Sequence, residues 1–292
     1  MRITSFTAIT TILCFAFVIT SAKADNHANL DNRLETILNS QPEAAKARYK
    51  YRHPQETLQF FGIKPGMTVA EVLPGRGWYT KILLPLLGKD GQLIGVDYNQ
   101  KMWPNFWFAD EQFIERKTIW VETWTRGAAE WATPDSAPIS AYQFGQIPEK
   151  LKGTADAVLF IRALHHLVRL NEKGNYLTQA LQETYDILKP GGIVGVVQHH
   201  AQEDRPDKWA DGNNGYLKKS LVIKAMQDKG FKFVGESDIN ANPKDQAGPG
   251  DIVWRLPPTL RGSNDDTKKR AAMVAIGESN RMTLKFIKPL AK

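Results

Sequence analysis

Short, continuously apolar runs alternate with amphipathic stretches along most of this chain. Strands that are apolar on both faces belong to parallel sheets covered by helices on both sides. Two later runs, residues 231–235 and 282–287, instead alternate apolar and polar residues, as edge or antiparallel strands do. The pattern predicts a doubly wound, Rossmann-like α/β fold. The buried strands are expected at residues 67–72, 92–97, 156–161 and 193–198, and the clearest helices at 78–87, 176–188 and 217–229.

The first 24 residues resemble an export signal. Arg2 supplies a positive start, residues 3–19 carry no charge, and Ala22-Lys23-Ala24 matches a small-x-small cleavage site. The apolar stretch is diluted by threonines and shorter than the roughly 20 residues that a bilayer requires. We therefore predict cleavage after Ala24 and a periplasmic or secreted protein, with a retained membrane anchor as the alternative.

The rest of the chain divides by composition. We expect a helical cap over residues 25–61 and one large domain over 62–292, interrupted by a helical insertion at about 103–138. The insertion holds five of the eight tryptophans, which line an apolar substrate pocket or pack a helical layer. Arg48, Arg52 and His53 precede the first strand, as part of a lid or of a solvated helix face. The five tryptophans are Trp103, Trp107, Trp120, Trp124 and Trp131.

Cysteine content and charge exclude several classes of protein. Cys14 is the single cysteine and lies in the signal segment, so the mature chain has no disulfide, thiolate metal site or cysteine nucleophile. The formal net charge of +7 is spread along the chain without a run of five like charges. We expect a small-molecule substrate, no nucleic-acid partner and no membrane association after cleavage.

The decisive local sequence runs from Val69 to Thr80 and leads from a strand through glycines into a helix. Gly75 and Gly77 allow the backbone to approach a ligand closely, but Thr80 stands where a dinucleotide site has its third glycine. Glu71 lies four residues before Gly75 and suits a ligand that carries a sulfonium and an ammonium group. Asp97 ends the second strand, where a carboxylate can accept both ribose hydroxyl hydrogens.

These positions give the predicted ligand contacts. Each carboxylate can also simply cap the turn that follows its strand, and Tyr79 can pack in the core as well as wall a pocket. The candidate cofactor-binding residues are Glu71, Gly75, Gly77, Tyr79, Asp97 and Tyr98.

Four motifs together resemble the class I S-adenosylmethionine-dependent methyltransferases. Residues 71–77 resemble their nucleotide loop, and residues 91–97 their second strand with its ribose acid. Residues 156–166 and 188–192 are similar to the fourth strand and to the turn before the fifth. The resemblance implies S-adenosyl-L-methionine as cofactor and a seven-stranded sheet in the order 3-2-1-4-5-7-6 with the last strand antiparallel.

A closer resemblance covers nearly the whole mature chain. Residues 52–61 and 277–286 look like an exported bacterial branch of predicted methyltransferases. The chain departs from the superfamily pattern at Leu73, which replaces the first motif glycine, and at Pro74, which lacks an amide donor. The loop near the methionine end of the cofactor is therefore expected to differ.

Four of the six histidines follow two strands that are neighbours in this sheet order. His165 and His166 follow the fourth strand, and His199 and His200 follow the fifth. Ligands bind outside the carboxyl ends of such strands, so we predict that these histidines supply the catalytic base. A pair of them with Glu203 or Asp204 is a weaker metal-site alternative that no ligand spacing supports, and we expect no metal.

The sequence thus predicts a methyltransferase that acts on a small nucleophile. Export leaves the source of S-adenosylmethionine outside the cytoplasm unexplained, which keeps a second hypothesis open: a noncatalytic exported module that binds an adenosyl metabolite or another small ligand. A nicotinamide-dependent oxidoreductase is a third hypothesis, which the missing third glycine opposes.

Overall fold

A computed structural model describes residues 30–290, so the predicted export signal at residues 1–24 lies outside the described residues. The described chain begins with a helix over residues 30–39, followed by three short helices. No helix between residues 30 and 290 combines the length and apolarity that a membrane span requires. The three helices are α2 (Glu43–Lys46), α3 (Tyr49–Arg52) and α4 (Pro54–Phe61).

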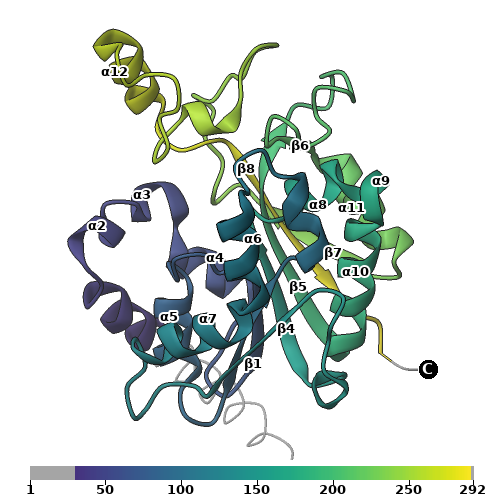
Figure 1. The fold of residues 1–292 in the computed structure, drawn as a ribbon. Coiled ribbons are helices and arrows are strands. Elements are labelled where there is room, and N and C mark those ends of the chain that lie inside the picture. Colours follow the sequence, from purple (N-terminus) through teal and green to yellow (C-terminus); the bar gives the residue numbers. More distant parts are fainter. Residues whose placement is uncertain (1–29, 291–292) are drawn as a thin grey trace, which may run out of the picture.

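A single twisted sheet forms the centre of the molecule (Figure 1). Its main path has the order β3-β2-β1-β4-β5-β8-β7, and β8 runs antiparallel to both of its neighbours. The prediction of a Rossmann-like sheet with a reversed last strand is confirmed. The two-residue strand β6, which pairs with β5, was not predicted. The strands are β1 (Thr68–Val72), β2 (Gln92–Asp97), β3 (Ile139–Gln143), β4 (Ala155–Ile161), β5 (Leu188–Ala201), β6 (Leu217–Lys218), β7 (Lys232–Ser237) and β8 (Arg281–Ile287).

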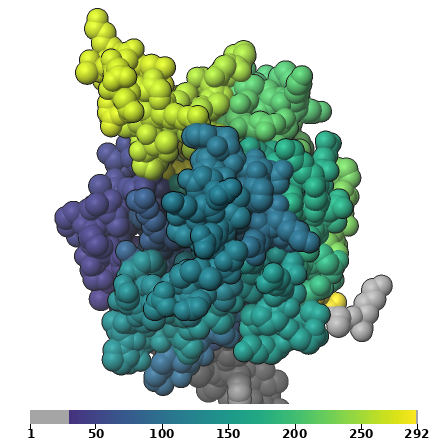
Figure 2. All heavy atoms as spheres, viewed as in Figure 1, coloured from purple at the N-terminus to yellow at the C-terminus, as the bar shows by residue number. Residues whose placement is uncertain are grey.

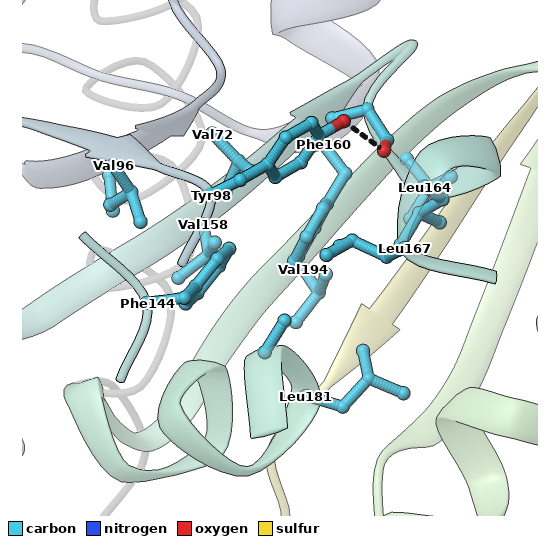
Figure 3. Close-up of a cluster of buried hydrophobic side chains, with 14 of the residues drawn as sticks. Val72, Val96, Tyr98, Phe144, Val158, Phe160, Leu164, Leu167, Leu181 and Val194 are labelled. Atoms are coloured by element: carbon cyan, nitrogen blue, oxygen red, sulfur yellow. Dashed lines mark hydrogen bonds between the residues drawn. The ribbon is translucent and has the colours of Figure 1, made fainter. Parts of the chain in front are cut away.

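Helices cover both faces of the sheet, because alternate residues of each central strand face opposite sides. On one face, Val69, Leu93 and Leu159 pack with side chains of α4, α5 (Thr80–Leu87) and α7 (Trp120–Ala129). On the other, Val72, Val96 and Phe160 pack with α8 (Leu164–Arg169), α10 (Tyr176–Ile187) and α11 (Lys219–Asp228). Figure 3 shows part of this second cluster.

Two connections lie near the carboxyl ends of the parallel strands. Between β2 and β3 the chain forms the 3-10 helix η1 (Gln100–Asn105), α6 (Glu111–Thr118) and α7. Between β7 and β8 it forms a long loop with η3 (Val253–Arg255) and α12 (Thr267–Ile276), which projects from the body of the molecule (Figures 1 and 2). These two connections border the candidate site. The remaining short elements are η2 (Glu149–Leu151) and α9 (Asn171–Gly174).

Candidate functional site

A cavity of about 240 Å³ lies at the carboxyl ends of β1, β4 and β5. The end of β1 contributes Leu73, and the turn after β4 contributes Arg162. The loop between β7 and β8 covers the cavity with residues 253–259 and 278–279. We call this the inner cavity. Its histidines are His165, His166 and His199.

Two non-glycine residues that line the inner cavity have left-handed backbone conformations. Leu73 has φ of 55° and Arg162 has φ of 61°. The amide of each donates to the neighbouring strand, Leu73 N to Val96 O at 2.7 Å and Arg162 N to Val197 O at 2.6 Å. Such a conformation costs on the order of 1–3 kcal/mol and persists where the surrounding structure enforces it, often at functional sites. The strain therefore marks the ends of β1 and β4 as a candidate site.

His165 has a defined tautomer. Gln198 donates through Nε2 to Gly215 O at 2.9 Å, which turns its Oε1 toward His165 Nδ1 at 3.3 Å. Nδ1 therefore carries the hydrogen, and Nε2, which has no hydrogen-bond partner in residues 30–290, keeps its lone pair. Burial lowers the pKa of His165 to about 4, so the ring is neutral at neutral pH.

The other two cavity histidines are also uncharged at neutral pH. His199 Nδ1 lies 2.6 Å from Ser279 Oγ, and burial with the neighbouring His165 lowers its pKa well below the usual value. His166 contacts His165, with ring centroids 4.0 Å apart, and burial lowers its pKa likewise. The structure thus brings three of the four predicted histidines together as neutral imidazoles.

His200 does not line the inner cavity. It follows His199 on β5 and so faces the other side of the strand, where its pKa is lowered first by burial and then by Lys219. Glu203, suggested as a metal ligand, instead accepts from Ser220 N at 3.0 Å and from Ser220 Oγ. In the part of the chain that the structure describes, no three His, Cys, Asp or Glu side chains are grouped as metal ligands.

Several arginines surround one buried carboxylate beside the inner cavity. Glu278 lies within ion-pair distance of Arg48, Arg52 and Arg281, at 2.5, 3.1 and 3.3 Å. Burial alone would raise the pKa of Glu278, but these guanidinium groups together lower it. Arg162 lies close enough to this cluster for Arg281 to lower its pKa after burial, to about 10. We call these five residues the arginine cluster.

This cluster was not predicted. Arg52 was expected in a lid or on a solvated helix face, but the residue is only 3% exposed. Its partner Glu278 is 226 residues away in the chain. The one usable signal was Arg162, a charged residue that directly follows a buried strand.

On the other side of β1, Asp97 ends β2 and is 1% exposed. Its Oδ2 accepts from Lys117 Nζ of α6 at 2.7 Å, whereas Oδ1 has no hydrogen-bond partner in the described chain. The Lys117 ammonium also lies 3.9 Å from the centroid of the Trp103 ring. Burial raises the pKa of Asp97, although Lys117 opposes the shift. A buried acceptor without a partner is rare and indicates a place for a donor from a ligand.

The two loop glycines differ in their surroundings. Gly75 is exposed, and a Cβ built there would have only the Leu73 carbonyl oxygen, at 3.9 Å, within contact distance. A Cβ at Gly77 would collide with the ring of Trp131, which covers this part of the loop. We call Gly75, Gly77 and Asp97 the β2 side of the candidate site, and the inner cavity its β4 side.

The remaining predicted contacts are buried. Glu71 accepts from Thr80 Oγ1 at 2.6 Å, and burial raises its pKa to about 8. Tyr79 packs in the core next to Arg52. Tyr98 crosses from β2 toward β4 and donates to Ala163 O at 2.5 Å (Figure 3).

The sequence left two roles open for the tryptophans of the insertion, packing in the core and lining a pocket, and the structure shows both. Trp103 and Trp124 are buried in the two main cores. Trp107 is 79% exposed and lines a second cavity of about 590 Å³, which adjoins the inner cavity. Trp131 covers Gly77, and Trp120 stacks on Trp124.

Comparison with known proteins gives the following similarities. No model of a known protein family matches the chain. It is 29% identical to ribosomal RNA small subunit methyltransferase H of Protochlamydia amoebophila over 42% of this chain and 42% of that protein, less than half of the relative's length. A geranyl diphosphate methyltransferase solved with SAM matches with a TM-score of 0.50 and 16% identity, over 82% of this chain and 85% of that one. A SAM-dependent methyltransferase from Aquifex aeolicus has a TM-score of 0.48 and 16% identity, over 85% and 98% of the two chains.

Proposed function

We propose that this chain, which has the fold of the class I S-adenosylmethionine-dependent methyltransferases, transfers a methyl group from S-adenosylmethionine to a small nucleophile. The observation that carries the proposal is the unpartnered buried oxygen of Asp97, which ends β2 beside a glycine loop. Across β1 from it lies a cavity lined by three neutral histidines.

The residues of the β2 side fit an adenosyl ligand. Asp97 Oδ1 is free to accept a hydrogen bond from a ribose hydroxyl, and the exposed Gly75 leaves room for close approach. Lys117 and Trp131 occupy the rest of this side, so α6 and the end of α7 shift when the ligand binds. Glu71 is protonated near neutral pH, so it supports the start of α5 through Thr80 rather than supplying a negative charge.

The histidines of the inner cavity are proposed to deprotonate the acceptor. When bound, S-adenosylmethionine supplies a methyl group already activated on a positively charged sulfur. His165 lines the inner cavity, and its unprotonated Nε2 is the group proposed to take the proton of a hydroxyl, amine or thiol as that group attacks. Gln198 and Gly215 hold the ring in this tautomer.

Isothermal titration with S-adenosylmethionine, S-adenosylhomocysteine and NAD tests the proposal. We expect both adenosyl ligands to bind and NAD not to bind. Absence of adenosyl binding would contradict the proposal, and binding of NAD alone would favour an oxidoreductase. Binding of S-adenosylhomocysteine without methyl transfer to any acceptor would favour a noncatalytic binding module.

The acceptor is proposed to be a small molecule, because the histidines lie inside a cavity behind the 253–259 segment. The curated relative is named for ribosomal RNA, so RNA is the competing acceptor. Transfer of a labelled methyl group separates the two: label in the small-molecule fraction of a cell extract supports the proposal, whereas label confined to ribosomal RNA overturns it.

We also propose export and cleavage after Ala24, on the charge and apolar pattern of residues 1–24. Mass analysis of the protein from its native host tests this proposal. A mature chain that begins at Asp25 is expected, and an intact Met1–Ala24 segment would contradict cleavage.

A further inference from the structure

One short segment holds an unusual concentration of polar atoms without partners. Residues 30–290 contain nine buried side-chain polar atoms that lack a hydrogen bond, and four belong to residues 162–169. Most buried polar groups in folded proteins have a partner, so a local excess of unpaired groups indicates a missing ligand. The four atoms are Arg162 Nε, His165 Nε2, His166 Nδ1 and Arg169 Nε.

This segment lines two adjoining cavities. Arg162 and His165 line the inner cavity, and Arg169 lines the outer cavity of about 590 Å³ that also contains Trp107. His166 and Trp254 belong to both linings, with nearly parallel rings whose centroids are 5.9 Å apart. The two cavities therefore adjoin each other at these two rings.

The charged groups that line the two cavities are nearly all positive. Arg169 and Arg261 line the outer cavity and Arg162 lines the inner one. Glu278 is the one acid in either lining, and it is already paired with Arg48, Arg52 and Arg281. Excess positive charge in a partly desolvated site strongly favours an anion.

Aromatic rings line the outer cavity. Phe106, Trp107 and Phe108 come from the segment after η1, and the Arg261 guanidinium lies 4.8 Å from the centroid of the Trp107 ring. Such walls accept a flat, apolar body, whereas the inner cavity is small and cationic. The two cavities together fit a compact molecule with an apolar part and one anionic group.

We propose that the methyl acceptor is a small molecule with one carboxylate or phosphate, whose anionic group binds at Arg162 beside the histidines. That this molecule is the methyl acceptor rests on the proposed methyltransferase function. The anion site itself does not depend on that function. The competing occupant of Arg162 is the carboxylate of the methionine part of the cofactor.

Calorimetric titration with inorganic phosphate and with acetate tests the anion site without any cofactor. We expect at least one of the two probes to bind the wild-type protein with a millimolar Kd and to bind Arg162→Gln at least about tenfold more weakly, since a charged hydrogen-bond partner is lost. Arg162→Lys keeps the charge and should retain part of the affinity. Arg270→Gln, an equal change of charge on the exposed face of α12, should bind as the wild type does.

A second titration identifies what Arg162 holds. We expect S-adenosylhomocysteine and 5′-methylthioadenosine, which lacks the amino-acid part, each to bind Arg162→Gln as they bind the wild type. Loss of S-adenosylhomocysteine affinity alone would assign Arg162 to the cofactor carboxylate and overturn the proposal. Absence of binding by both anions, or equal binding to Arg162→Gln, would also overturn it.

A measurement on the wild-type protein covers the case in which the variant does not fold. If Arg162→Gln does not fold, NMR signals of the His165 and His199 rings in the wild-type protein report the site, and they should shift on addition of phosphate or acetate. Unchanged ring signals would contradict the proposal. Failure of S-adenosylhomocysteine to bind would remove the methyltransferase function alone, because the anion titrations are made without it.

Discussion

The two sides of the candidate site satisfy their polar groups differently. On the β2 side protein groups occupy most of the space: Lys117 pairs with one oxygen of Asp97 and Trp131 covers Gly77, so that only Asp97 Oδ1 lacks a partner in the described chain. On the β4 side a cavity remains, and three of the residues that line it, Arg162, His165 and His166, each have a buried side-chain nitrogen without a partner within residues 30–290. A ligand must displace Lys117 and Trp131 on the β2 side, whereas on the β4 side it can enter the existing inner cavity. Substitutions should therefore affect ligand affinity on the β2 side, and stability or anion binding on the β4 side.

The largest change in stability is expected at Glu278, whose negative charge balances the arginines of the arginine cluster. Glu278→Gln leaves Arg52 and Arg281 buried without a counter-charge, which should lower the free energy of unfolding by about 3–5 kcal/mol. Urea unfolding measures the change. Glu122→Gln, which breaks the exposed pair with Arg126 on α7, is the control and should cost less than about 1 kcal/mol. Equal losses of unfolding free energy in the two variants would contradict the role of Glu278 as the counter-charge of buried arginines on the β4 side.

The neutral histidines should make stability depend on pH. Because the pKa of His165 is lowered to about 4, the folded state disfavours its protonation, and the stabilisation present above pH 6.5 is lost as the pH falls toward 4. Relative to His165→Gln, the wild type should lose about 3 kcal/mol of unfolding free energy over that range. Unfolding curves at several pH values measure this difference.

The comparison with His165→Gln isolates the contribution of this one ring. A gap in unfolding free energy between the wild type and His165→Gln that stays constant from pH 6.5 to pH 4 would contradict the neutral, desolvated state of the inner cavity.

On the β2 side, Asp97 and Lys117 should change ligand affinity in opposite directions. Asp97→Asn removes a charged acceptor and should weaken S-adenosylhomocysteine binding by about tenfold or more. Lys117→Met removes the group that competes for Asp97 and should tighten binding by about threefold. Calorimetry measures both, and weaker binding by Lys117→Met would mean that the lysine serves the ligand rather than competing with it.

The smallest effect is expected at Glu71. Because its pKa is raised to about 8, Glu71 is mainly protonated at pH 7, and Glu71→Gln should change the Kd of S-adenosylhomocysteine by less than about threefold. A tenfold loss at pH 7 would restore the charged role that the sequence pattern favoured.

The fold could be predicted from the sequence because its strands are buried on both faces. The apolar run Gln92–Asp97 coincides with β2, and the alternation at residues 282–287 identifies β8, which begins one residue earlier. β6 was missed because a strand of two residues has no periodicity. From residue 30 onward, the predicted helical cap over residues 25–61 is divided into four separate helices.

The candidate site was predictable only in part. Histidines that follow neighbouring strands must meet at one edge of the sheet, which located His165 and His199. Nothing local distinguishes Arg52 or Glu278 from surface residues, because their burial depends on contacts between segments more than 200 residues apart. The pairing of Asp97 with Lys117 was hidden for the same reason: its position depends on how α6 folds back over β2.

A crystal structure of the complex with S-adenosylhomocysteine tests the central claim most directly. We predict that Asp97 releases Lys117 and bonds the ribose hydroxyls, that Trp131 leaves Gly77, and that the inner cavity with Arg162 stays open for an acceptor. A complex in which Asp97 keeps Lys117 while the ligand lies elsewhere, or a protein that takes up no ligand, would contradict the account.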